Sequence, residues 1–259
     1  MSVSRARSTI GAVAWRNIYT TMKTPSLAVP PLMVPIFTLA VFAGGLSVMS
    51  RVPNFRFNGD YTAFTFIFVL VQAATMCGHF SSLAMTRDFE TKFMRRLMLA
   101  VPKRWQIVAG FVVAAIVRCL VTVPILFAFG LLFQMDVQGD PIDLLKLTGL
   151  SVLVTVIAAF WSMGMGLRLR TTQAAPAMMM PIFASLFMAP AFVPLVAMQG
   201  WLHDVAEWNP VTMFVETSRG LISGDAQNVG ATVAVGVGMI LVLWVWLETG
   251  LRKAQAAGG

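Results

Sequence analysis

Few side chains in this sequence could carry out chemistry, and they form no catalytic or metal-binding set. Cys77 and His79 are close enough in sequence to share a metal ion, but the only other histidine, His203, is far along the chain. A tetrahedral zinc site needs four ligands. No nucleophile and base are spaced so that they could act together. We therefore expect no metal, no catalytic residues and no enzymatic activity in this chain.

The sequence also lacks the Gly-x-x-x-x-Gly-Lys-[Ser/Thr] loop that would cradle the phosphates of ATP. We expect no cofactor in this chain. Cys77 and Cys119 both lie within apolar runs, which favours buried free thiols over a disulfide.

Two strongly polar side chains, His79 and Arg118, lie inside long apolar segments. A charge in the hydrocarbon region of a bilayer costs at least about 2.5 kcal/mol, so Arg118 has either a function or a structural role. The structural role is favoured, with the long side chain reaching towards the membrane surface. No acidic residue lies inside these segments, whereas an ion-coupled carrier normally needs carboxylates near the middle of the membrane.

The elements that hold these residues must suit a membrane. Of the 259 residues, 58% are hydrophobic and 12% are charged, and the mean hydropathy is +0.77, whereas soluble domains carry roughly 25% charged residues. A membrane-spanning helix needs about 20 mostly apolar residues. Six segments meet that length and predict an all-α membrane protein: 28–49, 63–85, 107–133, 144–167, 174–198 and 229–247.

Charge predicts the orientation of these spans. Most basic residues lie before the first span, in the second and fourth connections and in the tail at 248–259, while most acidic residues lie in the other connections. By the positive-inside rule both termini are cytoplasmic, and the chain is a multi-pass protein of a bacterial cytoplasmic membrane. The net charge of +8 is spread over the ends of apolar runs, so we expect membrane lipids and no nucleic acid as partners. Because polar residues interrupt residues 5–23, we expect no signal peptide at the N-terminus.

The segment before the spans, 1–27, is expected to be a cytoplasmic interface helix. Ala12, Trp15, Tyr19 and Met22 recur at helical spacing, with Arg16 and Lys23 opposite them. A simple topogenic anchor is an equal alternative.

The second connection, about 86–100, is expected to be an amphipathic helix in the cytosol. Phe89, Phe93 and Leu97 follow one another at four-residue spacing and form an apolar stripe, while Asp88 and Lys92 can pair on the opposite surface. Val101 and Pro102 end this helix. The stripe needs headgroups or a partner protein to bury it.

The segment at about 199–228 is expected to be an external re-entrant hairpin inside a permease domain at 28–247. Asn209 and Pro210 form an N-cap and first-turn proline, and Ser223-Gly224 a stop. The helix between them is too short to span. Glu216 and Arg219 can pair at three-residue spacing, and Trp201 and Trp208 suit the membrane interface.

The order of these features resembles the permease subunits of ABC type 2 exporters, over essentially the whole chain. The loop reads Arg87-Asp88-Phe89-Glu90-Thr91-Lys92-Phe93-Met94-Arg95-Arg96-Leu97 before Pro102. The external residues Phe192-Val193-Pro194, Trp201-Leu202, Asn209-Pro210 and Glu216-Thr217-Ser218-Arg219-Gly220-Leu221 resemble the drug-exporting branch, which includes the daunorubicin-resistance permeases. Phe89 and Lys92 depart from the usual Glu-rich, Gly-Thr-containing loop, which leaves the closest ATPase partner open.

The resemblance implies an exporter of two permeases, identical or homologous, with two cytosolic ABC ATPases that bind ATP and Mg. It implies a coupling helix seated in the ATPase, with the candidate residues Arg87, Asp88, Phe89, Glu90, Lys92, Phe93, Arg96 and Leu97. It also implies an external gate, with the candidate residues Trp201, Trp208, Asn209, Pro210, Phe214, Glu216 and Arg219. His79 and Arg118 are the membrane-embedded polar residues.

The predicted function is export of a hydrophobic drug, antibiotic or lipid-like substrate, with ATP hydrolysed by another subunit. Two alternatives remain: an ion-coupled carrier or channel without an ATPase, and a membrane scaffold that transports nothing. In the last span Gly230, Ala234 and Gly238 recur every four residues, which favours close packing within the subunit over a dimer contact.

Overall fold

The structure is a computed structural model that describes residues 3–45, 57, 59–101 and 103–256, and every regular element within these ranges is helical. This confirms the all-α class. The helices are α1 (Val3–Lys23), α2 (Pro25–Ala28), α3 (Pro30–Gly45), α4 (Tyr61–Glu90), α5 (Phe93–Ala100), α6 (Trp105–Leu132), α7 (Pro141–Leu169), α8 (Ala175–Phe187), α9 (Trp201–Trp208), α10 (Pro210–Ile222) and α11 (Val229–Ala256), with 3₁₀ turns η2 (Thr172–Ala174) and η3 (Leu195–Ala197).

Four helices in the described part of the chain are long and apolar enough to cross a membrane: α4, α6, α7 and α11. The helices of the first and fifth predicted spans are shorter. Helix α3 has 16 residues, and α8 has 13 with Pro181 inside it. A helix of 13 residues is about 20 Å long, less than the roughly 30 Å of a hydrocarbon core. Six spans therefore stay a prediction, and residues 46–49, Arg51, Arg56 and Pro102 lie outside the described ranges.

The second half of the predicted fifth span is irregular. After α8 ends at Phe187, the chain to Gly200 contains only the short turn η3. Pro190 and Pro194 lie in this stretch, and proline removes the backbone donor that a continuing helix needs.

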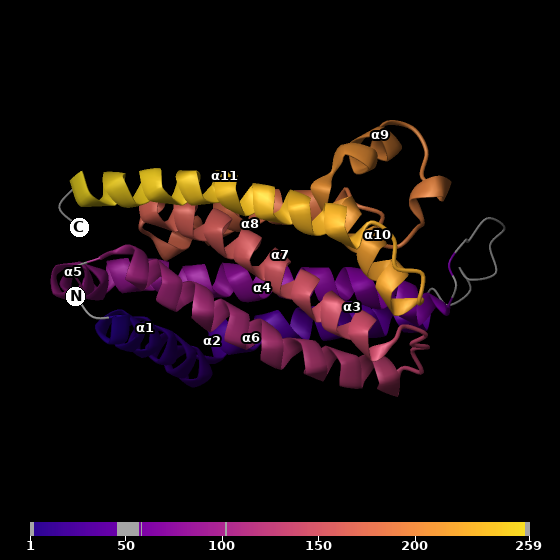
Figure 1. Ribbon diagram of the computed structural model, residues 1–259, viewed down its shortest axis with the longest axis horizontal. Coiled ribbons are helices and arrows are strands. Elements are labelled where there is room, and N and C mark those ends of the chain that lie inside the picture. The colour runs from indigo at the N-terminus through magenta and orange to yellow at the C-terminus, as the bar shows by residue number, and fades with distance from the viewer. Residues whose placement is uncertain (1–2, 46–56, 58, 102, 257–259) are drawn as a thin grey trace.

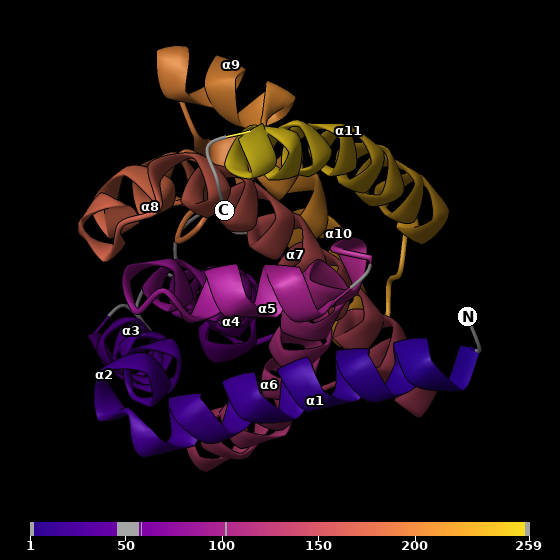
Figure 2. The ribbon, with the colours of Figure 1, turned by 90° about the vertical axis from the view of Figure 1, so that its left-hand side faces the viewer.

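Helix α4 forms the centre of the bundle. Nearly every residue between Tyr61 and Asp88 is buried, and α4 packs against α3, α6 and α7 (Figures 1 and 2). Gly78 permits the closest approach to α7, because a Cβ there would collide with the backbone of Thr155 and Ala159. Asp60 begins the helix by accepting hydrogen bonds from the backbone N–H groups of Thr62 and Ala63.

Helix α1 turns two polar side chains into the protein, together with Val13 and Ala14. Asn17 and Thr21 are buried against the bundle, where α1 packs along α6, while Trp15 and Met22 are exposed. Figure 2 shows α1 crossing the lower face of the bundle. The predicted apolar face therefore points outward, as expected for a helix whose outer surface contacts lipid.

The small-residue stripe of α11 does not pack within the subunit. Gly230, Ala234 and Gly238 are all exposed, and a Cβ at either glycine would meet nothing within 4 Å. Gly236 faces the bundle instead, against Leu153 and Phe214. The prediction of intramolecular packing at this stripe is wrong, because the opposite face of α11 buries against α7.

The two ends of the bundle carry different elements. The start of α1, the end of α11 and α5 lie at one end, and the connection from α6 to α7 lies at the other with the end of α10 (Figure 1). The candidate coupling and external residues are thus at opposite ends.

Candidate functional site

The candidate coupling region is an elbow between two helices. Helix α4 ends at Glu90, and Lys92 adopts a left-handed conformation with φ of 57° before α5 begins at Phe93. The prediction of one continuous helix over 86–100 is wrong. Phe89 and Phe93 consequently lie on different helices, and they do not share a face of one helix.

Helix α5 buries methionines and exposes basic residues. Met94 and Met98 belong to a core cluster with Met85 and Phe111 from the neighbouring helices. Phe93 and Leu97 are half-buried. Arg95, Arg96 and Leu99 are exposed, with Leu99 84% accessible. We call these three residues the outward face of α5.

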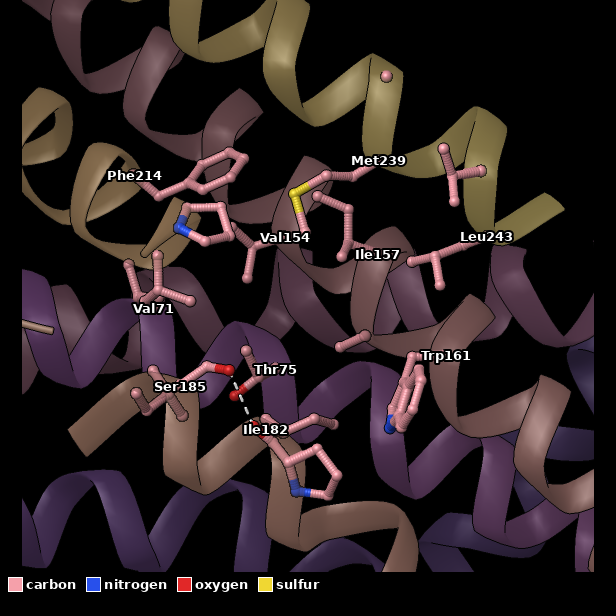
Figure 3. Close-up of a pocket in the computed structure, with 17 residues that line it drawn as sticks. Val71, Thr75, Val154, Ile157, Trp161, Ile182, Ser185, Phe214, Met239 and Leu243 are labelled. Atoms are coloured by element: carbon pink, nitrogen blue, oxygen red, sulfur yellow. Dashed lines mark hydrogen bonds between the residues drawn. The ribbon is translucent and has the colours of Figure 1, made fainter. Parts of the chain in front are cut away.

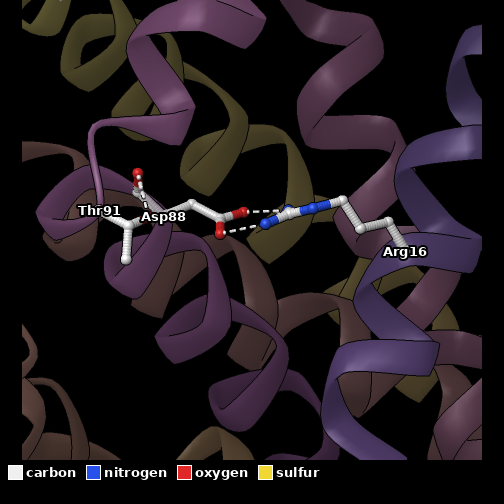
Figure 4. Close-up of polar contacts among 3 residues, drawn as sticks. All are labelled: Arg16, Asp88 and Thr91. Carbon is white, nitrogen blue, oxygen red and sulfur yellow. Dashed lines mark hydrogen bonds and ion pairs between the residues drawn. The ribbon is translucent and has the colours of Figure 1, made fainter.

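An ion pair connects this elbow to the N-terminal helix. The guanidinium of Arg16 donates to both carboxylate oxygens of Asp88, at 2.6 and 2.8 Å (Figure 4). The same guanidinium lies 3.7 Å from the centre of the Phe93 ring. The predicted pairing of Asp88 with Lys92 is wrong, because α4 ends before Lys92 and the helical spacing is lost.

A second contact connects the elbow to the connection between α7 and α8. Glu90 accepts hydrogen bonds from the backbone N–H of Thr172 at 2.7 Å and from the hydroxyls of Thr171 and Thr172. The guanidinium of Arg170 lies 5.9 Å from the Phe89 ring. Sequence analysis did not find Arg16 or Thr172 as partners, because 72 and 82 residues separate them from Asp88 and Glu90 and no local spacing signals such pairs.

The candidate external region contains two dissimilar helices joined at Asn209. The Asn209 side chain accepts from the backbone N–H of Val211 at 3.0 Å and donates to the carbonyl of Ser185 on α8 at 2.6 Å. The predicted N-cap, Pro210 at the first position and the stop at Ser223 are confirmed. Helix α10 is packed against α4 and α7. On α9, by contrast, Trp201 and Trp208 are exposed.

Arg219 is the most enclosed charge of this region. It forms the predicted pair with Glu216 at 2.8 Å and also donates to the carbonyl of Ala191 at 3.1 Å. Its guanidinium lies 3.4 Å from the centre of the Phe64 ring. Burial lowers the pKa of Arg219 to about 10, and Glu216 opposes that shift, so the side chain remains charged near neutral pH. Arg219 thereby joins α10 to the start of α4.

The membrane-embedded polar residues hold helices together. The guanidinium of Arg118 on α6 donates to the Cys77 carbonyl at 3.1 Å, to Asn17 Oδ1 at 3.2 Å and to Thr21 Oγ1 at 2.8 Å. Its polar partners come from α1 and α4, so it does not need to reach the membrane surface. His79 is buried, with Nδ1 3.2 Å from the hydroxyl of Ser162 on α7.

Within the described ranges, no three Cys, His, Asp or Glu side chains lie together in a way that could hold a metal ion. Cys77 and Cys119 are free and buried.

Comparisons with known proteins agree with this architecture. The chain matches a family described as "ABC-2 type transporter" over residues 8–222. It is also 25% identical over 248 residues to a protein of Porphyra purpurea named "Putative transport permease ycf38", an alignment that covers 92% of this chain and 84% of the relative. The match includes α4 to α7, the elbow and α10, but not α11. The chain therefore belongs to the ABC-2 type transporter family.

Proposed function

We propose that this chain is the permease subunit of an ABC exporter in a bacterial cytoplasmic membrane, moving a hydrophobic drug, antibiotic or lipid-like molecule outward. ATP and Mg are bound by a separate ABC ATPase, present in two copies, and a second permease, identical or homologous, completes the pathway. Both termini of the chain are cytoplasmic. The name of the Porphyra purpurea relative supports the permease role.

The observation that carries this proposal is the outward face of α5. Arg95, Arg96 and Leu99 are exposed at the end of the bundle that is proposed to be cytoplasmic, although the other face of α5 is well packed. An exposed leucine next to two exposed arginines suits a partner surface that has an apolar pocket with an acidic rim.

Within this coupling site the predicted residues have two roles. Arg96 contacts the ATPase directly, together with Arg87 and Lys92, which are also exposed. Asp88, Glu90, Phe89 and Phe93 hold the elbow in shape through the contacts described above, and half-buried Leu97 packs against the core cluster that contains Met94 and Met98. Movement of the ATPase would then reach α1 through Arg16 and α8 through Thr172.

The external region is proposed to be a re-entrant gate. Arg219 and Glu216 connect α10 to α4, and Phe214 packs in the core beneath them. Trp201 and Trp208, at the exposed side of α9, are placed at the outer membrane interface in this arrangement.

Substitution of the outward face tests the proposal. We expect Arg95→Glu, Arg96→Glu and Leu99→Asp together to abolish copurification of the ATPase and substrate-stimulated ATP hydrolysis while leaving folded permease in the membrane. Like charges would then face the acidic rim, and the apolar anchor is lost.

Arg252→Glu is the matched control. Arg252 is exposed near the end of α11, at the same end of the bundle, and it pairs only with Glu248 in the described structure. It should retain the ATPase. The proposal is wrong if the triple variant still copurifies its ATPase at the wild-type level, and transport by this chain reconstituted alone would favour the carrier or channel.

A further inference from the structure

A cavity of about 600 Å³ lies between α4, α7, α8, α10 and α11. Val71, Val154, Ile182, Phe214 and Met239 line it, one from each of these helices, and Trp161 lies at one end (Figure 3). The cavity is half-open, and its lining includes the exposed side chain of Val242. Its volume falls within the roughly 300–1,000 Å³ typical of small-molecule sites. Its lining includes Pro210 and Phe214 of the candidate gate residues, but neither Arg219 nor any residue of the elbow.

The polar groups in the wall of the cavity already have partners. The hydroxyl of Thr75 donates to the Gln72 carbonyl at 2.7 Å, and the hydroxyl of Ser185 donates to the Pro181 carbonyl at 2.9 Å. The indole N–H of Trp161 donates to the Met178 carbonyl at 3.0 Å. A ligand in this cavity would therefore meet carbon and sulfur atoms and no unused donor.

The cavity lies at mid-depth of the long helices. Thr75 is at the middle of α4, Ile157 is near the middle of α7, and Met239 and Leu243 are near the middle of α11. At this depth a charged group is costly, and an apolar cavity does not hold water stably. A helix is about 10–12 Å wide, so this volume would hold only about one helical turn. A thin, flexible, apolar occupant fits these limits better.

We infer that this cavity binds one hydrocarbon chain of an amphiphile, with its headgroup outside at the membrane surface. Methionine and aliphatic side chains adapt to a flexible chain, and the half-open space between the five helices contacts such a chain on more sides than a flat helix surface contacts bulk lipid. The chain comes from a resident membrane lipid or from an exported amphiphile, and the two sources present the same chemistry to the cavity. The inference does not rest on the proposed export, because binding needs neither an ATPase nor transport.

Helix α11 offers a matched pair of variants. Gly238 lines the cavity, and a Cβ there would meet nothing within 4 Å, so Gly238→Phe adds a ring at the cavity without a collision at the backbone. Gly230 is equally unobstructed but does not line the cavity. Gly230→Phe makes the same chemical change on the same helix and is the control.

Photolabelling in lipid nanodiscs tests the inference. The probe is a phosphatidylcholine with a diazirine at the end of one acyl chain, and labelled peptides are mapped by mass spectrometry. We expect saturable labelling of the α8 and α11 peptides that contain Ile182 and Met239 in the wild type and in Gly230→Phe. In Gly238→Phe this labelling should fall about tenfold, equivalent to about 1.4 kcal/mol. Equal labelling in both variants, or labelling spread evenly over lipid-facing α6, would overturn the inference.

Competition in the wild type separates the two sources. Loss of labelling with excess unlabelled phosphatidylcholine, but not with a single-chain alkylammonium compound, supports a resident lipid. Displacement by the alkylammonium compound at low occupancy supports an exported amphiphile. Persistent labelling with both competitors shows that the site is not a saturable chain-binding site and overturns the inference.

Discussion

Arg118 and its partners show how this protein uses charge inside apolar surroundings. An arginine that leaves water must find hydrogen-bond acceptors in the protein, because a buried charge without partners destabilises the folded state. Helix α1 supplies two acceptors, Asn17 and Thr21, and α4 supplies the Cys77 carbonyl. Asp88 likewise supplies the acceptors for Arg16. This pair is partly shielded from solvent, because the side chain of Asp88 is 10% exposed and that of Arg16 is 37% exposed. The free energy of such a pair lies between the roughly 1 kcal/mol of exposed pairs and the roughly 3–5 kcal/mol lost when a buried pair is broken.

Removing an acceptor from Arg118 should therefore destabilise the fold only while the arginine is present. We expect Thr21→Val to lower the thermal unfolding temperature in detergent, because it removes the 2.8 Å bond and leaves a buried charge with fewer partners. Loss of a hydrogen bond to a charged group lowers the free energy of unfolding by about 1.5–3 kcal/mol.

In the Arg118→Leu background the same Thr21→Val change should have little effect. An equal loss of unfolding temperature in both backgrounds would show that Thr21 acts through packing and not through Arg118.

Helices α5 and α11 each have a covered and an exposed face, and the sequence pattern did not predict which face is covered. On α5 the aromatic ring of Phe93 is half-buried, and the basic face is exposed. On α11 the regular small-residue stripe is exposed, and the glycine that packs is outside the stripe. In each helix the face that buries is decided by the neighbouring helices.

A leucine substitution should affect stability on only one of the two faces of α11. Ala234→Leu should leave the stability of the isolated subunit nearly unchanged, because Ala234 is exposed. Gly236→Leu should lower the yield and the unfolding temperature, because a side chain there would collide with Leu153 and Phe214. Overpacking of this kind costs about 1–3 kcal/mol or more.

The measurement is thermal unfolding of purified protein, followed by size-exclusion chromatography in detergent. A loss of assembly in Ala234→Leu with unchanged subunit stability would assign the stripe to a contact with another copy. Destabilisation of the subunit by Ala234→Leu that equals that of Gly236→Leu would contradict the packing described here.

The whole molecule has two distinct ends. The elbow, the start of α1 and the end of α11 lie at one end, and the loop from α6 to α7 lies at the other (Figure 1). The charge distribution predicts that the first end is cytoplasmic. This arrangement places the proposed ATPase contact on the side where ATP is available.

Labelling of the membrane protein in intact cells tests this orientation. A reporter fused after Gly259 should be cytoplasmic, and single cysteines placed at Asp140 or Asp204 should react with an impermeant maleimide from outside. Cys77 and Cys119 are buried, so the wild type provides a low background. Reaction at Asp140 and Asp204 only after the membrane is permeabilised would reverse the orientation.

The sequence by itself determined the class of protein, the positions of four long apolar helices and the start and stop of α10. These features depend on local composition: runs of apolar residues, an Asn-Pro cap and a Ser-Gly end. The Glu216–Arg219 pair was also predictable, because a helix brings residues three apart together. The family resemblance needed only the order of such features.

Only the tertiary structure decided which face of each element is covered. It placed the left-handed turn at Lys92 between the two phenylalanines and paired Asp88 with Arg16. It also turned Asn17 and Thr21 of α1 inward towards Arg118. It also placed five helices around the half-open apolar cavity. In a membrane both lipid-facing and protein-facing surfaces are apolar, so hydrophobicity cannot distinguish them. The contacts between segments distant in sequence make that distinction, and no local spacing encodes them.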